Sequence, residues 1–336
     1  MQLQAAAGRA RNRKGHGLRR HPMLNTILCA TDFSEHFRST IDWGIWLSRR
    51  FGSRMLVFHA VPSTRDILYA TDVSVTGRTI DDDIELTRHR LEALMAGCGV
   101  NWEPLIGYGD SVESLAPVVA SKGIDLVVAA SYGLSGIKRM LLGTVVERMA
   151  RSLNCPLWVV RGTRRKGPPP GGIRRILVAC DFSPEFKPVL SMAAALAEAF
   201  DARIRLVHAI ESPVAEEIDF SAGPYEEVQQ ELQQSLKDRL LQMIIRASST
   251  DVPADAAALP GHPGEQIPLH ARHWKADLIV VGVRRIGKVQ KYLRGSTTEA
   301  LLRKAPCSVL AVPAGSMPAS GTEARAAGAG RKRSGP

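Results

Sequence analysis

The sequence predicts an α/β protein made of two tandem domains, each with a mainly parallel β-sheet and helices on both faces. Strand-like and helix-like segments alternate along the chain, the same order of segments occurs twice, and a stretch rich in proline, glycine and arginine separates the two copies. Because parallel neighbouring strands need crossover connections, which are usually helices, this alternation favours parallel sheets.

The first copy contains five strand patterns and four helix patterns. Its first helix is the clearest, with apolar residues at Phe37, Ile41 and Ile45 and a stop signal at Gly52. The expected strands span 25–31, 54–61, 100–106, 124–129 and 156–160, and the expected helices span 35–51, 79–96 and 111–121 and begin again at 144.

The second half of the chain is explained by a tandem duplication. Matched residues lie 149 positions apart at the start of each copy and 152 apart at its end: Asp32 and Asp181, Phe51 and Phe200, His59 and His208, then Gly143 and Gly295, Cys155 and Cys307. Self-similarity over a whole domain length indicates duplication rather than a solenoid of short units. We therefore expect domains at 23–161 and 173–313, joined by a linker at 162–172.

The positive charge lies mostly outside the expected domains. The chain has a formal net charge of +11, but residues 1–22, 161–175 and 314–336 together carry more positive charge than that. The remainder is therefore mildly acidic. We expect 1–22 and 314–336 to be disordered, basic tails that aid solubility. Weak, salt-dependent nucleic-acid binding by these tails is the less favoured alternative.

Cysteine use and hydropathy indicate a cytoplasmic protein. The five cysteines have no close pairs, so they do not suggest a disulfide framework or a CxxC metal site. The N-terminal segment lacks the apolar core of a signal peptide, and no apolar run approaches the ~20 residues of a membrane span. We expect no membrane insertion.

The stretch from Ala130 to Thr144 is the strongest candidate for a binding site. It follows an apolar strand, contains three glycines and a basic pair, and ends where a helix pattern begins. Amides exposed by glycine, cationic side chains and a helix N-terminus together favour an anion, with phosphate as the leading choice. Thr144 and Glu147 also fit a capping box, which leaves the earlier amides free.

Asp32 and Asp181 are the second candidate. Each follows the first strand of its copy, at the carboxyl end where open α/β sheets bind ligands. A carboxylate there can accept hydrogen bonds from ribose hydroxyls or an adenine amino group. The alternative is a helix-entry role, although Ser34 and Ser183 already provide the expected N-caps. We expect the histidine that ends the second strand of each copy to be a packing residue.

The combined pattern resembles the universal stress protein family, present twice in tandem. The resemblance rests on the sequence ILxAxDFS, the histidine at the end of the second strand, and a glycine motif. In ATP-binding members this motif reads G-x2-G-x9-G-[ST], and the first copy reads Ala130-x2-Gly133-x9-Gly143-Thr144. Alanine, the smallest alternative, replaces the first glycine.

The resemblance implies a role for each matched residue of the first copy. Asp32 would hold the ribose or adenine, Ala60 would line the adenine slot, and Gly133, Gly143 and Thr144 would cradle the phosphates. Ala130 keeps the pocket intact if its backbone takes an ordinary negative φ, whereas a positive φ would cost on the order of 1 kcal/mol or more.

The second copy has a degenerate form of the same motif, Gly282-x2-Arg285-x9-Gly295-Ser296, alongside Asp181. Arg285 fills space where phosphate would lie, so we expect this site to be lost or altered. An arginine that adds charge to a modified anion site is the less favoured alternative.

The resemblance further implies a Rossmann-like fold, with a five-stranded parallel sheet of order 3-2-1-4-5 in each domain and pairing through the last strand. Two domains in one chain can make that pair internally, and a homodimer stays open.

These expectations describe a non-catalytic stress-response protein. It binds ATP or a related adenine nucleotide in the first domain, with or without Mg²⁺, and the bound state changes its conformation or its choice of an unidentified protein partner. A scaffold that binds no nucleotide is one alternative. A weak ATPase or adenylating enzyme is another, although the sequence offers no recognisable base, nucleophile or metal cluster.

Overall fold

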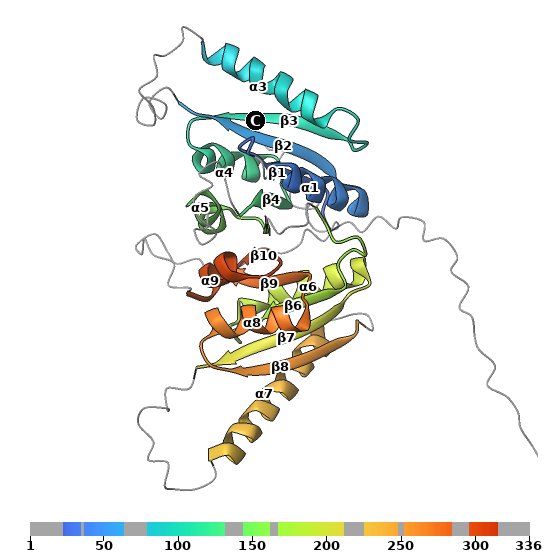
Figure 1. Ribbon diagram of the computed structural model, residues 1–336, viewed down its shortest axis with the longest axis vertical. Coiled ribbons are helices and arrows are strands. Elements are labelled where there is room, and N and C mark those ends of the chain that lie inside the picture. Colours follow the sequence, from blue (N-terminus) through green and yellow to red (C-terminus); the bar gives the residue numbers. More distant parts are fainter. Residues whose placement is uncertain are drawn as a thin grey trace, which may run out of the picture.

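The computed structural model describes residues 23–34, 37–63, 79–131, 144–161, 167–211, 225–247, 252–283 and 296–314. They form one ten-stranded β-sheet with helices on both faces (Figure 1). The strand order is β3-β2-β1-β4-β5-β10-β9-β6-β7-β8. The five strands of each half therefore have the order 3-2-1-4-5, which confirms the predicted fold class.

The first domain follows the expected order of elements. Its strands are β1 (Thr26–Ala30), β2 (Arg54–Val61), β3 (Trp102–Tyr108), β4 (Leu126–Ala130) and β5 (Leu157–Val160). Its helices are α1 (Phe37–Phe51), α3 (Ile80–Met95), α4 (Ser111–Ser121) and α5 (Thr144–Ser152). All neighbouring strands within this half are parallel.

The second domain repeats this arrangement. Its strands are β6 (Arg175–Ala179), β7 (Arg203–Ile210), β8 (Ala254–Pro260), β9 (Leu278–Val283) and β10 (Ser308–Pro313). Its helices are α6 (Phe186–Phe200), α7 (Tyr225–Ala247), α8 (Pro263–Trp274) and α9 (Ser296–Lys304). Helices α3 and α7, which occupy equivalent places in the two halves, lie at opposite ends of the molecule (Figure 1).

Two apolar layers cover the sheet, one on each face. Side chains of α1, α3, α6 and α7 pack on one face, and side chains of α4, α5, α8 and α9 pack on the other. Each layer runs through both domains. Strands β4, β5 and β9, which lie between these layers, are wholly apolar, as expected for parallel strands buried on both sides.

The two domains join through their last strands. β5 and β10 pair antiparallel, with Trp158 opposite Leu310, and both side chains are buried. The internal pair that the family resemblance implied is therefore present. A sheet of ten strands results because this pairing satisfies the backbone groups that two separate edges would expose.

Aromatic side chains continue the contact between the domains. The rings of Trp46 on α1 and Phe200 on α6 stack with centroids 5.1 Å apart, and the Phe51 ring, also on α1, lies 5.6 Å from that of Phe200. No role for Trp46 was evident in the sequence, because its contact with Phe200 depends on how the two halves meet.

The predicted helix cap of the second domain is wrong in position. The N-cap of α6 is Glu185, whose side chain makes no capping bond, so Ser183 is not the N-cap. In the first domain, residues 35 and 36, which separate Ser34 from the first described residue of α1, lie outside the described part of the chain, so the Ser34 cap stays a prediction. In both domains the aspartate two residues before the serine accepts the serine backbone N–H. In the second domain this side-chain turn delays the start of the helix.

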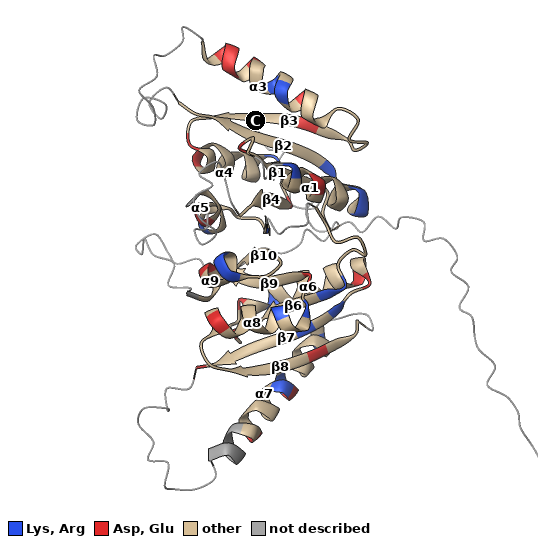
Figure 2. Ribbon diagram, viewed as in Figure 1, with Lys and Arg blue, Asp and Glu red and all other residues tan. Residues whose placement is uncertain are grey.

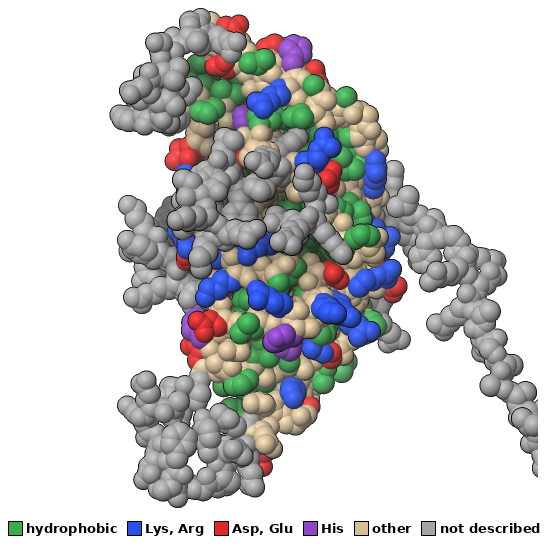
Figure 3. All heavy atoms as spheres, in the orientation of Figure 1, with side chains coloured by type: hydrophobic (Ala, Val, Ile, Leu, Met, Phe, Trp, Pro, Cys, Tyr) green, Lys and Arg blue, Asp and Glu red, His purple; other side chains and the backbone are tan. Residues whose placement is uncertain are grey.

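The surface carries charges of both signs. On the face shown in Figure 3, basic, acidic and apolar side chains of the described residues are interspersed. Among the residues that the structure describes, no helix has the length and apolarity needed to cross a membrane.

Candidate functional site

Three of the predicted site residues lie together at the carboxyl ends of strands in the first domain's sheet. Asp32 follows β1, Ala60 lies near the end of β2, and Ala130 ends β4. β1 pairs with β2 on one side and with β4 on the other. Chain direction therefore brings these residues to the carboxyl end of three adjacent strands, where the order of strands reverses. This is the topological switch point, the usual ligand site of open α/β sheets.

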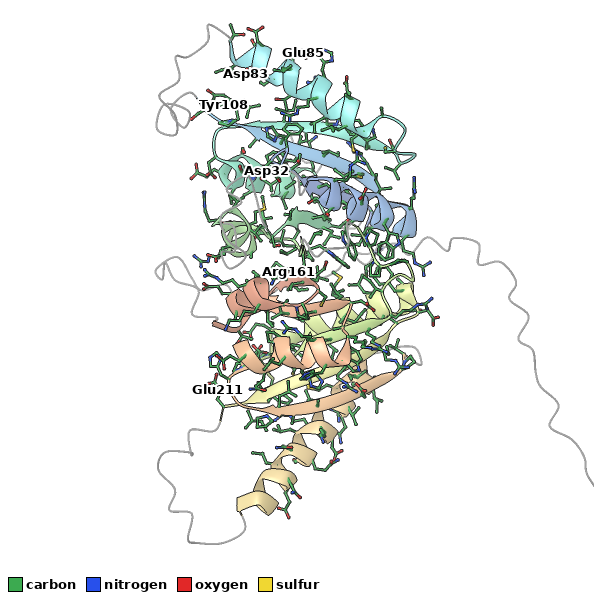
Figure 4. The ribbon with its side chains drawn as sticks, viewed as in Figure 1. Asp32, Asp83, Glu85, Tyr108, Arg161 and Glu211 are labelled. Atoms are coloured by element: carbon green, nitrogen blue, oxygen red, sulfur yellow. The ribbon has the colours of Figure 1, made fainter. Side chains whose placement is uncertain are left out.

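Asp32 lies in a tight turn after β1 (Figure 4). The backbone N–H of Thr31 donates to the carbonyl of Phe58 at 2.9 Å and keeps the end of β1 on β2. Phe33 then takes a left-handed φ of 58°. The carboxylate of Asp32 accepts the backbone N–H of Ser34 at 3.0 Å. The turn thus fixes the carboxylate at the edge of the sheet, half-exposed to solvent.

A stack of three side chains holds this turn. The Nδ1 atom of His59 lies 2.9 Å from the carbonyl oxygen of Thr31, and its ring lies 4.3 Å from that of Phe33. The guanidinium of Arg90, on α3, lies over the Phe33 ring, 4.2 Å from the ring centroid. A carbonyl can only accept, so Nδ1 carries the proton in the neutral histidine. Burial lowers the pKa of His59 below its usual value. His59 is therefore a packing and turn-holding residue, as the sequence suggested.

The second domain repeats the stack closely. Phe182 has a φ of 56°, and its ring lies 4.6 Å from that of His208, whose Nδ1 is 2.8 Å from the Cys180 carbonyl. The guanidinium of Arg239 lies 4.4 Å above Phe182. The carboxylate of Asp181 accepts the Ser183 N–H at 3.0 Å.

Sequence reasoning missed the arginine and phenylalanine members of these stacks. A signal was available, because Arg239 follows Arg90 by the same 149 residues that separate the paired histidines. What the duplication could not show is the left-handed backbone of the two phenylalanines, which brings the three side chains together.

Two buried hydroxyl groups near the Asp32 turn are unsatisfied. Ser131 directly follows β4; its backbone N–H donates to the Val160 carbonyl, but its fully buried Oγ has no hydrogen-bond partner among the described residues. Within the same part of the chain, the Oγ of Ser34 is likewise buried without a partner. Buried polar atoms are rarely left unpaired, because each costs about 1–3 kcal/mol. Two such hydroxyls beside the switch point are consistent with a polar ligand there.

Ala130 lies in extended backbone. It is the last residue of β4 and pairs in register with Val160 of β5. Its methyl group therefore causes none of the strain that a left-handed position would impose. Gly282, the equivalent residue of the second domain, also lies within a strand, opposite Val312.

The glycine loops themselves lie outside the described residues. Gly133, Gly143, Arg285 and Gly295 belong to these segments. Thr144 and Ser296 are the first residues of α5 and α9, and their side chains are also outside the described part.

Helices α5 and α9, which follow the two glycine loops, are held by different contacts. In the first, Arg148 of α5 makes a bidentate contact with Asp110, the N-cap of α4, at 2.6 and 2.8 Å. This guanidinium lowers the pKa of Asp110 below its usual range. In the second, the N-cap of α8 is His262, and Thr298 of α9 donates its hydroxyl to the Gly282 carbonyl at 3.0 Å. In the second domain, within the described part of the chain, α9 is thus tied directly to the end of β9.

The remaining chemistry-bearing groups do not gather into a second centre. Within the described residues, no three histidine, cysteine, aspartate or glutamate side chains are placed to hold a metal ion. Burial raises the pKa of the Cys155 thiol, and likewise that of Cys307, to about 12. Both thiols therefore stay protonated at neutral pH.

Both halves of the chain match one known protein family. The family model of the universal stress protein family matches residues 23–161 and again 172–313. A universal stress protein of Thermus aquaticus is 38% identical over 142 residues, which cover 41% of this chain and 98% of that protein. The universal stress protein YxiE of Bacillus subtilis is 26% identical over 151 residues, covering 41% of this chain and all of that protein.

Solved structures show the same two-domain architecture. A universal stress protein from Archaeoglobus fulgidus aligns over 87% of this chain and 99% of its own length, with a TM-score of 0.65 and 19% identity. A putative universal stress protein from Pseudomonas aeruginosa aligns over 87% of this chain and 94% of its own, with a TM-score of 0.59 and 17% identity. At these identities the likeness shows the fold alone. The two matches of the family model, which together span most of the chain, show that it belongs to the universal stress protein family, with two copies of the domain in tandem.

Proposed function

We propose that the first domain binds an adenine nucleotide, ATP or a close relative, and that the chain acts as a non-catalytic stress-response protein. The observation that carries the proposal is the Asp32 turn. It places a carboxylate at the switch point, holds it there by the Arg90–Phe33–His59 stack, and lies beside two buried hydroxyls that have no partner in the part of the chain that the structure describes.

The residues at this edge suit the parts of a nucleotide. The Asp32 carboxylate can accept hydrogen bonds from ribose hydroxyls or an adenine amino group. Ala60, with its short side chain on β2, leaves room for a flat base. The phosphates would lie toward the N-terminus of α5, where unpaired backbone amides and the helix dipole attract anions. Mg²⁺ would then be held mainly by the phosphates themselves.

We propose binding rather than catalysis because the histidine nearest to Asp32 already has a structural task. Its Nδ1 is engaged by the Thr31 carbonyl and its ring by Phe33. The bound nucleotide would instead change the chain's conformation or its affinity for a protein partner. The second domain acts chiefly as the built-in pairing partner through β10.

Two substitutions test the site. Asp32→Ala should weaken ATP binding at least tenfold, and Gly143→Trp should abolish it, as measured by isothermal titration calorimetry on the full chain. Asp181→Ala is the matched control, since it removes the equivalent carboxylate of the second domain, and it should leave ATP affinity unchanged. ATP affinity equal to that of the parent in the Gly143→Trp protein would refute the site.

A scaffold that binds no nucleotide is the second candidate. The shared sheet and the aromatic contacts between the domains favour it, because they already make the two halves one structural unit. Mass spectrometry of small molecules released by acid from purified protein separates the two proposals. Copurified adenine nucleotide would argue against the scaffold.

A further inference from the structure

An ion-pair network links the first turn of α5 to the last turn of α9 across the domain boundary. Arg303 of α9 donates to the Glu147 carboxylate of α5 at 2.7 Å and also contacts Glu299 of its own helix at 2.8 Å. Arg151 lies farther from Glu147, at 3.8 Å. Figure 2 shows charges of both signs on these two neighbouring helices. The Glu147 side chain is only 15% exposed, so its charge is poorly screened by water.

The first domain holds α9 at a second point. Arg161, which follows β5, donates through Nε to the Ala305 carbonyl at 2.7 Å and through Nη1 to the Leu302 carbonyl at 3.3 Å. These contacts hold the C-terminal end of α9, where Arg303 lies, against the first domain.

Glu147 stands close to where the proposed phosphates would bind. It is three residues after Thr144, the first residue of α5, which is about 4.5 Å along the helix axis. A carboxylate there stabilises the helix N-terminus but repels an anionic ligand. Arg303 offsets this repulsion by pairing with the carboxylate.

We infer that Arg303, from the second domain, is a positioning residue for nucleotide binding in the first. It neutralises Glu147 and so lets the start of α5 accept a polyphosphate. This inference rests on the proposed function. The second domain then contributes to the site itself, because without Arg303 the negative charge of Glu147 would repel the phosphates. The effect should grow with the negative charge of the ligand and shrink at high salt.

The experiment measures ATP, ADP and adenosine binding to the full chain by calorimetry, at low and high salt. Arg303→Gln should weaken ATP binding about fivefold at low salt, ADP less, and adenosine not at all. Arg303→Lys, which keeps the charge, should retain most of the affinity. Glu147→Gln combined with Arg303→Gln should restore ATP binding to within about twofold of the parent, because the uncompensated carboxylate is gone. Lys304→Gln, an exposed lysine on the same helix, is the matched control and should bind like the parent.

The outcomes are distinguishable. Equal losses for adenosine and ATP in Arg303→Gln, or no rescue by the double substitution, would show a merely structural role and overturn the inference while leaving nucleotide binding intact. Parent-like ATP affinity in Arg303→Gln would overturn it as well. A parent chain that binds none of the three ligands overturns the proposed function itself, and this inference with it.

Discussion

Phe33 and Phe182 position Asp32 and Asp181 at the carboxyl end of the first strand of each domain. A bulky residue in the left-handed region costs on the order of 1 kcal/mol or more. Each ring is packed between a histidine and an arginine, and these contacts offset the cost. The same arrangement in both domains shows that the aspartate turn survives even where the glycine motif has diverged.

The histidine of the first stack makes stability depend on pH. The pKa of His59 is lowered in the folded state, mainly by burial, so the unfolded chain binds more protons near and below pH 6.5. His270, whose Nε2 lies 3.3 Å from Arg205, has a lowered pKa from burial and from that guanidinium. The stabilising contribution of both neutral histidines is therefore complete above about pH 7 and is lost as the pH falls through 6.5.

Urea unfolding at pH 7.5 and pH 5.5 checks this dependence. The free energy of unfolding should fall with pH, and His59→Gln should reduce the fall because glutamine can still donate to the Thr31 carbonyl without titrating. His89→Gln, at an exposed position on α3, is the control. A His59→Gln protein with the same pH dependence as the parent would contradict the assignment.

The residue-level features of the site were only partly predictable. Asp32 and Ala60 follow from strand ends and motif spacing, and the structure brings them to one edge. Phe33 and Arg90 were missed because their contact requires a positive φ and a partner on α3, 57 positions along the chain. The unsatisfied hydroxyl of Ser131 depends on how β4 and β5 end together, which no local pattern encodes.

Helix α1 approaches β1 unusually closely at Gly44. A Cβ atom there would lie 2.2 Å from the Sγ of Cys29 and 2.9 Å from the Cε of Met55. Gly44→Ala should therefore lower the free energy of unfolding by about 2 kcal/mol, since the helix must shift away from the strand. Gly171→Ala, where a Cβ would meet nothing within 4 Å, should change it by less than about 0.5 kcal/mol. Chemical denaturation of both variants measures the difference, and equal stabilities would show that α1 adjusts freely.

At the scale of elements, most segments could be predicted because hydrophobic period and length are local properties. β2 and α4 have the predicted bounds, and Thr79, where the second helix was expected to begin, is the N-cap of α3. The cap of the second domain's first helix was placed too early, because the serine preference for N-caps competes with the aspartate turn that precedes the helix. Local rules conflict there, and the turn prevails.

At the scale of the whole molecule, Trp158 lies at the centre of the joint between the domains. It is fully buried on β5, opposite Leu310 of β10 and 5.3 Å from Trp43. Trp158→Ala should lower the free energy of unfolding by about 4 kcal/mol. It should also split the thermal transition, because the halves would then lose the contact that makes them unfold together.

Differential scanning calorimetry distinguishes this effect from simple destabilisation. Trp102→Ala is the control: Trp102 is half-buried on β3, at the far edge of the sheet, and its loss should lower the melting temperature without splitting the transition. A single transition in the Trp158→Ala protein, like that of the control, would mean that the joint has other dominant contacts.

The antiparallel junction of β5 and β10 also has a consequence for stoichiometry. The last strand of each half pairs with the last strand of the other half of the same chain, so this strand edge is not available to pair with a second molecule. Two unlike halves encoded in one gene are produced in equal amounts and meet at very high effective concentration. A diverged half is thus never paired with another diverged half. Duplication followed by fusion leaves one copy free to diverge in its glycine motif while it remains an obligatory neighbour of the other copy.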